Sequence, residues 1–381
     1  MKIFFRFGFL LFFVVFIATS CGERSQKANK PNNLSEPDMV NRYASGFRIL
    51  HFDNYTKVVL NNPWDTNGGP YAVYYLYKND SISLPDDGFK LKIPLNSIIV
   101  NTFSYFEFLS KIDEIDKITG VTDAHRIYNP YILNKLREKK VTDLGDPFRP
   151  DLERTLAQKA NAVIVSAYAQ QDTYNERLLN AGIPIIYSLE WMENSPLARA
   201  EWIKMIAAFF DKEALADSIF NEIELRYKAV KEKVADIPQK HTVMAGDNFQ
   251  GTWYVPGGNS FNAILFRDAK LDYYHKNNKE SGSIGLDIES VLTQFGETEY
   301  WFGCQADSYR ELETKDRKYM LFRSVKNKKV FNIRNRTTVS GGNDYFESAT
   351  ANPDLVLEDL IKAAHPHLFR DTTFTYIKPL E

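Results

Sequence analysis

The residues best suited to ligand chemistry in this 381-residue chain are aromatic side chains in glycine-rich segments. In the segment 247–260, Trp253 and Tyr254 precede Gly257-Gly258, between an expected strand and an expected helix. Glycine lets the backbone turn tightly, and the flat, amphipathic faces of Trp and Tyr suit planar ligands. In α/β folds ligands bind in crevices beyond the carboxyl ends of strands. The segment therefore predicts ligand contacts, although either ring could equally pack beneath a loop.

A second segment, 334–347, combines fixed positive charge with aromatic rings. Arg334 and Arg336 could neutralise an anionic ligand, and Tyr345 could stack on it. Further candidates in the first half of the chain also follow expected strands: Ser104, Tyr128 and Tyr168. Together these residues favour a cleft for a large, flat or polyaromatic ligand.

Motifs for hydrolysis, nucleotide binding and zinc catalysis are absent. The sequence has no Gly-x-Ser-x-Gly, no Gly-Lys-Ser/Thr and no His-Glu-x-x-His. The 6 histidines are scattered, whereas a zinc or manganese site needs several converging ligands. A formal net charge of −2 argues against a polyanion-binding protein. We therefore expect no enzyme activity, no metal site, no cofactor and no nucleic-acid partner.

Strands and helices alternate along the chain and must position these residues. Apolar and polar residues alternate over 46–77, which predicts a small β-meander. Strand and helix patterns then alternate over 97–187 and again over 242–364, which indicates βαβ units with mostly parallel sheets. Between them, Ser195-Pro196 starts a helical stripe that continues to Val234 and would be about 50–60 Å long. The predicted fold is α/β, with two Rossmann-like lobes joined by one long backbone helix, and a small N-terminal β-meander.

The N-terminus has the composition of an export signal. Lys2 and Arg6 precede an apolar run over 7–18, which is shorter than the ~20 residues that span a bilayer. Cys21 follows Thr19-Ser20 and resembles the end of a bacterial lipobox, which implies acylation of Cys21 and an anchor of several lipid chains. An ordinary signal peptide with a buried Cys21 is the alternative. Cys304 is expected to be a buried free thiol.

These observations divide the chain into five parts. The segment after the signal is polar and suits a flexible tether. The expected parts are a lipoprotein signal peptide at 1–20, a tether at 21–40, an N-terminal lobe at 41–192, a backbone helix at 193–236 and a C-terminal lobe at 237–381.

Several motifs carry a resemblance to a known family. They lie at 141–153, 195–203, 253–258, 283–289 and 352–366. With the order of elements, they resemble the solute-binding proteins of bacterial ABC importers, in the helical-backbone class of the TroA-like superfamily that takes ferric siderophores, haem or cobalamin. The resemblance covers residues from about 47 to 380.

The resemblance implies a function. It describes a monomeric, lipid-anchored receptor in the cell envelope, facing the periplasm, that captures an iron chelate in an interlobe cleft and delivers it to an ABC permease dimer with its ATPase. In this family one glutamate on each lobe docks into arginine pockets of the permease, and the matching positions are Glu153 and Glu289. Both open expected helices, where the helix dipole alone favours an acid.

Other functions stay open at this point. A cobalamin or metal-ion receptor of the same architecture would use a similar cleft. A surface glycan-binding lipoprotein would carry its stacking aromatic residues on an open face. An extracytoplasmic enzyme would place a nucleophile beside a base in the cleft.

Overall fold

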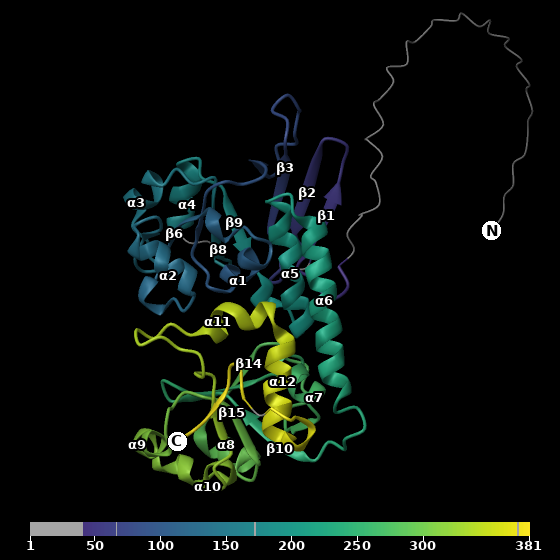
Figure 1. Cartoon of the computed structure of the whole chain (residues 1–381), viewed down its shortest axis with the longest axis vertical. Coiled ribbons are helices and arrows are strands. Elements are labelled where there is room, and N and C mark those ends of the chain that lie inside the picture. The colour runs from purple at the N-terminus through teal and green to yellow at the C-terminus, as the bar shows by residue number, and fades with distance from the viewer. Residues whose placement is uncertain (1–40, 66, 171–172, 372) are drawn as a thin grey trace, which may run out of the picture. The chain divides into compact units, whose positions relative to one another are not determined.

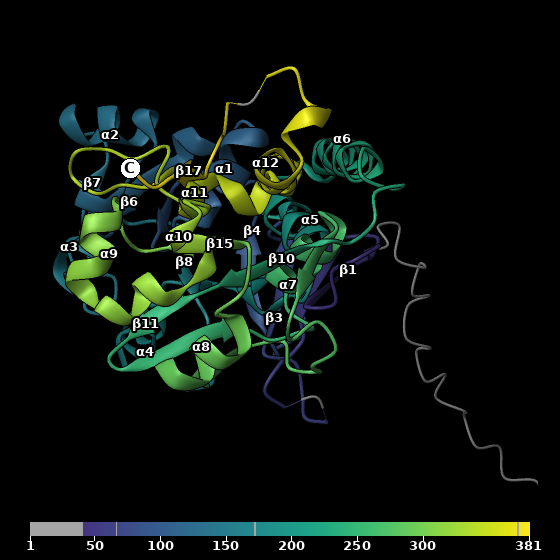
Figure 2. The ribbon, with the colours of Figure 1, turned by 90° about the horizontal axis from the view of Figure 1, so that it is seen from below.

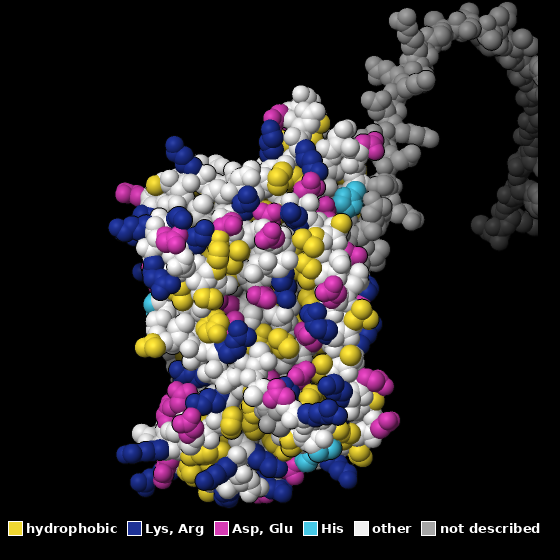
Figure 3. Space-filling view, in the orientation of Figure 1, with side chains coloured by type: hydrophobic (Ala, Val, Ile, Leu, Met, Phe, Trp, Pro, Cys, Tyr) yellow, Lys and Arg dark blue, Asp and Glu magenta, His cyan; other side chains and the backbone are white. Residues whose placement is uncertain are grey.

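The computed structural model describes residues 41–65, 67–170, 173–371 and 373–381 (Figure 1). The expected signal peptide, Cys21 and the tether lie outside the described residues. None of the helices in the described part of the chain has the length and apolar content of a membrane span. Acidic and basic side chains are interspersed over the face shown in Figure 3.

The N-terminal sheet confirms the predicted meander and adds one strand to it. β1 (Phe47–His51), β2 (Tyr55–Leu60) and β3 (Ala72–Tyr77) are antiparallel neighbours, and β4 (Phe89–Lys92) pairs with β3 in parallel. Alternate residues of β1, such as Phe47, are buried, as expected for a sheet with one covered face. The Phe47 ring meets the indole of Trp202 edge to face, with centroids 5.1 Å apart. This sheet therefore packs on the helix that carries Trp202.

The first lobe contains a parallel five-stranded sheet, as the alternating pattern predicts. Its strand order is β7-β6-β5-β8-β9, and every neighbouring pair is parallel. Asn129 caps one of the helices by accepting the N–H groups of Tyr131 and Ile132 with its side chain. The elements are β5 (Ile98–Val100), α1 (Ser104–Lys111), β6 (Ile118–Val121), α2 (Pro130–Arg137), β7 (Thr142–Asp143), α3 (Leu152–Ala157), β8 (Ala162–Ser166), α4 (Thr173–Asn180) and β9 (Ile185–Ser188).

The second lobe contains a five-stranded sheet in the order β13-β10-β15-β16-β17, parallel except for its last strand, and a separate antiparallel sheet in the order β11-β12-β14. Its strands are β10 (His241–Ala245), β11 (Asp247–Phe249), β12 (Thr252–Pro256), β13 (Leu271–Tyr273), β14 (Ser283–Leu286), β15 (Tyr300–Cys304), β16 (Val330–Asn332) and β17 (Lys378–Pro379). Its helices are α7 (Phe261–Asp268), α8 (Ile288–Phe295), α9 (Tyr309–Lys315), α10 (Arg323–Lys326), α11 (Asp344–Ser348) and α12 (Pro353–Ala364).

Short 3-10 turns join several of these elements: η1 (Ile115–Lys117), η2 (Ala124–Arg126), η3 (Glu190–Met192), η4 (Arg317–Leu321), η5 (Ala349–Ala351) and η6 (Pro366–Leu368). The mixed α/β class with parallel sheets is confirmed. Cys304 is a free, buried thiol, as expected.

The segment expected to be one long helix consists of two. α5 (Pro196–Ala208) begins at Ser195, whose hydroxyl accepts the N–H of Ala198, and α6 (Glu213–Glu232) begins after a tight turn. Asp211 in that turn has a left-handed φ of 58°, and the N–H of Lys212 returns to the carbonyl of Ala207. The apolar pattern continues across the break because Phe209 and Phe210 are buried in the turn itself. Periodicity alone therefore could not reveal the break.

The two helices have different neighbours. α5 packs against α6, and α6 lies beside α12 in both views (Figures 1 and 2). At 1.5 Å per residue, the 20 residues of α6 span about 30 Å. Along this length α6 contacts α5, which precedes the second lobe in the sequence, and α12, which belongs to the second lobe. The connection between the lobes is a helix pair rather than a single rod.

Every residue of α5 except Arg199 is buried, so the charged side chains of this helix need partners inside the protein. Glu201 and Lys204 are almost completely inaccessible, and the Lys204 ammonium lies 3.2 Å from Glu201 and 2.8 Å from Asp217. The Glu201 carboxylate also accepts the N–H groups of residues 42–44, at 2.8 to 3.1 Å. One buried carboxylate thus holds the chain that enters the N-terminal sheet.

We predict that Glu201→Ala lowers the free energy of unfolding by about 3–5 kcal/mol, because it removes half of a buried ion pair and leaves backbone donors unsatisfied. Urea denaturation followed by circular dichroism measures this change. Glu222→Ala on the exposed face of α6, where the side chain is 70% accessible, is the matched control and should change stability by less than about 0.5 kcal/mol. A loss below about 1 kcal/mol for Glu201→Ala would contradict the assigned role.

Candidate functional site

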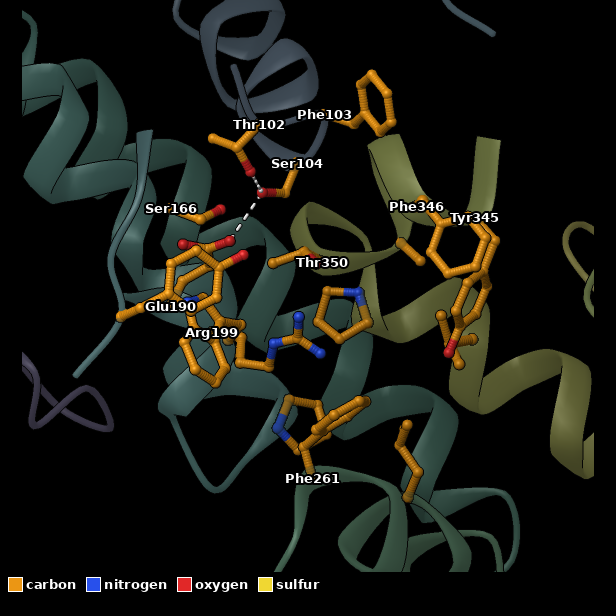
Figure 4. Close-up of a pocket in the computed structure, with 17 residues that line it drawn as sticks. Thr102, Phe103, Ser104, Ser166, Glu190, Arg199, Phe261, Tyr345, Phe346 and Thr350 are labelled. Atoms are coloured by element: carbon orange, nitrogen blue, oxygen red, sulfur yellow. Dashed lines mark hydrogen bonds between the residues drawn. The ribbon is translucent and has the colours of Figure 1, made fainter. Parts of the chain in front are cut away.

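A cavity of about 530 Å³ lies where loops of the first lobe face α5, α7, α11 and α12 (Figure 4). Such a volume is within the range of small-molecule sites. Thr102, Phe103 and Ser104 follow β5, while Ser166 and Tyr168 are at and beyond the end of β8. The cavity is therefore at the carboxyl ends of the parallel strands, where the fold class places ligands.

Arg199 is the cation of this cavity. Its guanidinium points into the space between Glu190 and Phe261 in Figure 4, and it lies 4.2 Å from the centroid of the Phe261 ring. Its Nε is buried, and within the described residues no hydrogen bond or ion pair satisfies it. Burial lowers the pKa of Arg199, and the Glu190 carboxylate opposes this shift.

Glu190 does not neutralise Arg199 directly. Its two carboxylate oxygens accept the hydroxyls of Ser104, at 2.7 Å, and of Ser188. The side chain is 2% exposed and belongs to the turn that follows β9. The two serine hydroxyls hold this carboxylate in place without an ion pair to Arg199, so the guanidinium keeps donors that an anion could use.

A second cavity, of about 600 Å³, continues the first. Trp191, Phe261 and Tyr345 line both spaces, and Tyr254 lines only the second. The walls of both are mainly apolar and aromatic. We call the two spaces together the cleft.

Four of the predicted ligand contacts line this cleft. Ser104, Tyr168 and Tyr345 line the first cavity, and Tyr254 lines the second. Burial raises the pKa of Tyr345, and the nearby Arg199 charge partly offsets that shift. The phenol therefore stays protonated and can donate a hydrogen bond.

Trp253 lies elsewhere, which corrects the expectation that it contacts ligand. Its segment is a β-hairpin of β11 and β12 rather than a loop, so alternate side chains face opposite sides. Trp253 is 0% exposed, packs against Trp301 at 5.2 Å, and donates its indole N–H to the carbonyl of Ala245. Tyr254, the next residue, faces the cleft. The sequence placed both rings in one loop because Gly251 and Gly257 obscured the alternation.

The two arginines expected to neutralise the ligand are paired within the protein. Arg334 lies 3.1 Å from Asp307, and Arg336 lies 3.1 Å from Asp344. Arg336 also donates to the hydroxyl of Tyr128 at 3.3 Å and stacks over its ring. None of Arg334, Arg336 and Tyr128 lines the two cavities of the cleft. Arg336 and Tyr128 form a contact between the lobes, whereas Arg334 pairs within the second lobe and lines a separate, smaller cavity.

Glu347 is at the centre of that contact. Its carboxylate accepts the N–H groups of Tyr128 and Asn129 at the start of α2, and its side chain is almost fully buried. Burial raises the pKa of Glu347 to about 8, the two N–H donors oppose this, and the Asp344 and Glu107 charges add to it. A carboxyl group from the second lobe thus caps a helix of the first.

The two predicted docking glutamates are exposed. Glu153 lies in the first turn of α3, and Glu289 lies in the first turn of α8. Glu289 is 70% accessible and forms an ion pair with Lys318 at 2.8 Å, which lowers its pKa.

Several residues that line the cleft were not selected as ligand contacts from the sequence: Phe103 and Phe346, although the segments that contain them were, and Glu190, Trp191, Arg199 and Phe261. A signal for Arg199 existed, because it interrupts the apolar run 196–200 of a helix that has few polar positions. Glu190-Trp191 follows directly after a predicted strand, as the chosen candidates did. Within the described residues, no group of three or more His, Cys, Asp and Glu side chains could hold a metal ion.

The chain was compared with known proteins. A sequence profile described as periplasmic binding protein matches residues 98–337. An uncharacterized lipoprotein of Methanocaldococcus jannaschii is 26% identical over 97% of this chain and 94% of its own length.

Solved structures share the fold. A periplasmic heme binding protein from Pseudomonas aeruginosa has a TM-score of 0.59 and 12% identity, over 75% of this chain and 98% of that one. A possible iron-binding (periplasmic solute-binding) protein from Staphylococcus epidermidis has a TM-score of 0.55 and 17% identity, over 72% of this chain and all (100%) of that one.

The contact made by Glu347 predicts a pH dependence of stability. Its ordinary pKa is 4.5 and its folded-state pKa is about 8, so between these values the folded chain keeps a proton that the unfolded chain has released. The contribution of this group to stability is therefore fully present below pH 4.5 and lost as the pH rises to about 8. We expect Glu347→Gln to flatten the decrease in urea midpoint between about pH 5 and 8.

The exposed Glu313→Gln variant is the matched control and should keep the wild-type profile. An unaltered slope in Glu347→Gln would show that other groups cause the pH dependence.

Proposed function

The chain belongs to the periplasmic binding protein family, and from this we propose that it is a lipid-anchored extracytoplasmic receptor that captures an anionic iron chelate, a ferric siderophore or haem. It delivers this ligand to an ABC permease dimer with its ATPase, without chemical turnover. The named heme-binding and possible iron-binding structural relatives support this ligand class.

The observation that carries the proposal is the Arg199 guanidinium in an aromatic cleft. Among the described residues Arg199 forms no ion pair or hydrogen bond through its buried Nε, and burying such a group is costly unless a bound anion pairs with it. Guanidinium groups match carboxylate and other planar oxyanions with two parallel hydrogen bonds. The rings around it suit the apolar or planar body of such a ligand. An anionic group on a large, flat body meets both requirements.

A cobalamin receptor of the same architecture is the alternative. The cleft is large, and the helical-backbone class that the sequence resembles includes such receptors. Binding of cobalamin depends less on a single anionic group. Removal of the Arg199 charge should therefore weaken binding of an anionic chelate more than binding of cobalamin.

Delivery involves the two lobes together. Glu153 and Glu289 are exposed carboxylates, one per lobe, and could pair with cationic pockets on a two-fold permease. Neither residue lines the cleft. Docking and ligand capture would therefore use separate surfaces.

The anchor rests on Cys21 and on the relative named a lipoprotein. A lipid anchor through Cys21 would hold the receptor near the permease. Loss of membrane association in Cys21→Ser, measured by fractionation, checks this assignment.

We predict that Arg199→Gln weakens binding of the anionic chelate by at least about tenfold, because a buried charge-assisted contact is lost. Calorimetric titration with ferric catecholate, ferric hydroxamate, ferric citrate, haemin and cobalamin measures this effect. Arg310→Gln on the exposed side of α9 is the matched control and should leave affinity unchanged. Binding of cobalamin alone, unaffected by Arg199→Gln, would favour the alternative.

The Arg334→Gln variant tests whether Arg334 contributes to ligand affinity. Arg334 already pairs with Asp307, so its loss should leave the affinity close to that of the wild type. A greater loss of affinity in Arg334→Gln than in Arg199→Gln would instead favour Arg334 as the ligand-binding cation, as predicted from the sequence.

For docking, the double variant Glu153→Lys with Glu289→Lys should abolish cellular uptake of the bound chelate while leaving its affinity unchanged, because like charges would then face the permease. Uptake of radioactive iron and calorimetric titration provide the two readouts. Glu313→Lys, another exposed acid, is the control. Normal uptake by the double variant would refute the docking role.

A further inference from the structure

A row of aromatic side chains connects the N-terminal sheet to the mouth of the cleft. The Trp64 ring lies 6.2 Å from Trp191 and 5.6 Å from Tyr71, and Trp191 lies 5.9 Å from Tyr168. These centroid distances are typical of interacting aromatic pairs. We call Trp64, Trp191 and Tyr168 the aromatic rim.

The rim keeps much of its ring surface accessible. Trp64 and Trp191 are each 37% exposed and Tyr168 is 51% exposed, whereas the other tryptophans of the chain, Trp202, Trp253 and Trp301, are fully buried. Large aromatic side chains gathered at one accessible place often mark a binding surface.

The rim is continuous with the cleft. Trp191 lines both of its cavities, and Tyr168 lines the first. Trp64 lines neither cavity, but its ring contacts Trp191 and so extends the aromatic surface that begins in the cleft. A ligand seated at Arg199 that is too large for the cleft would therefore emerge against these rings.

The chain holds the rim in place with specific contacts. The Asn62 side chain accepts the N–H groups of Trp64 and Asp65, at 3.0 and 3.3 Å, which fixes the turn that carries Trp64. Tyr71 donates its hydroxyl to the backbone carbonyl of Tyr168 at 3.0 Å. The N-terminal sheet is thereby attached directly to the loop that follows β8.

Trp64 and Tyr71 lie between β2 and β3 of the N-terminal sheet, which precedes residue 98, where the match to the family profile begins. The aromatic residues that the N-terminal sheet brings to the cleft therefore lie outside the region that the family profile covers.

We propose that the aromatic rim is a stacking subsite for a planar aromatic group of the bound chelate, and that the N-terminal sheet thereby selects chelates with aromatic donors over aliphatic ones. This inference rests on the proposed function. Ring stacking favours aromatic over aliphatic groups, whereas the positive charge of Arg199 attracts anionic chelates of both kinds.

The test compares aromatic and aliphatic anionic chelates by calorimetric titration. Haemin and the ferric complex of 2,3-dihydroxybenzoate are the aromatic probes, and ferric citrate is the aliphatic probe. Trp64→Leu should weaken binding of the aromatic probe about two- to twelvefold and leave ferric citrate unchanged. Trp64→Phe, which keeps a ring, should restore most of the affinity.

Phe249→Leu is the matched control, since Phe249 is an exposed aromatic residue that lines neither cavity, and it should change no affinity. Thermal melting of each variant confirms that it is folded. Trp64 is exposed, so a folding defect is not expected from its replacement.

The outcomes separate the two proposals. If the wild-type protein binds an aromatic probe and Trp64→Leu binds it equally well, the subsite is overturned but the receptor function is not. Binding of ferric citrate alone, or an equal loss for aromatic and aliphatic probes, also overturns the subsite. Wild-type protein that binds none of the probes overturns the proposed ligand class, and the subsite with it.

Discussion

Protein surrounds α5, and every one of its residues except Arg199 is buried. A helix inside the protein can keep charged residues only if each finds a partner. Glu201 and Lys204 pair with one another, and Glu201 also receives backbone N–H groups of residues 42–44. The third charged residue of α5, Arg199, faces the cleft and has no such partner among the described residues. The same helix therefore anchors the N-terminal sheet with one face and places a cation in the cleft with another.

This arrangement links the elements that form the cleft. Because residues 42–46 bond to Glu201 and Glu193, the chain enters β1 at a defined place on α5. The N-terminal sheet then carries Tyr71 to the loop after β8, where Tyr168 lines the cleft. On the opposite side, Glu347 caps α2 and brings α11 against the first lobe. The cleft is thus enclosed by contacts that are polar and specific, while its walls are mainly apolar.

Much of the fold was predictable because it follows from local patterns. The meander, the alternating strands and helices, and the caps at Asn129 and Ser195 each depend on residues close in sequence. The division between α5 and α6 was not predictable, because Phe209 and Phe210 are buried in the turn and continue the apolar stripe. For the site, Ser104, Tyr168, Tyr254 and Tyr345 were identified by their position after strands or in glycine-rich segments. Trp253 was misplaced because burial on one side of a hairpin depends on what packs against it.

The α/β class, the parallel order of elements, and the aromatic and glycine-rich character of the segments around the cleft follow from periodicity and residue type, and could be predicted from the sequence. Which cations are left without an ion pair depends instead on contacts that form only when the chain folds. Arg334 and Arg336 looked free in the sequence, but Asp307 and Asp344 neutralise them, whereas Arg199 looked like one polar position in a helix and lies beside the cleft. Ion pairing depends on distances between residues remote in sequence, and those distances exist only in the folded chain.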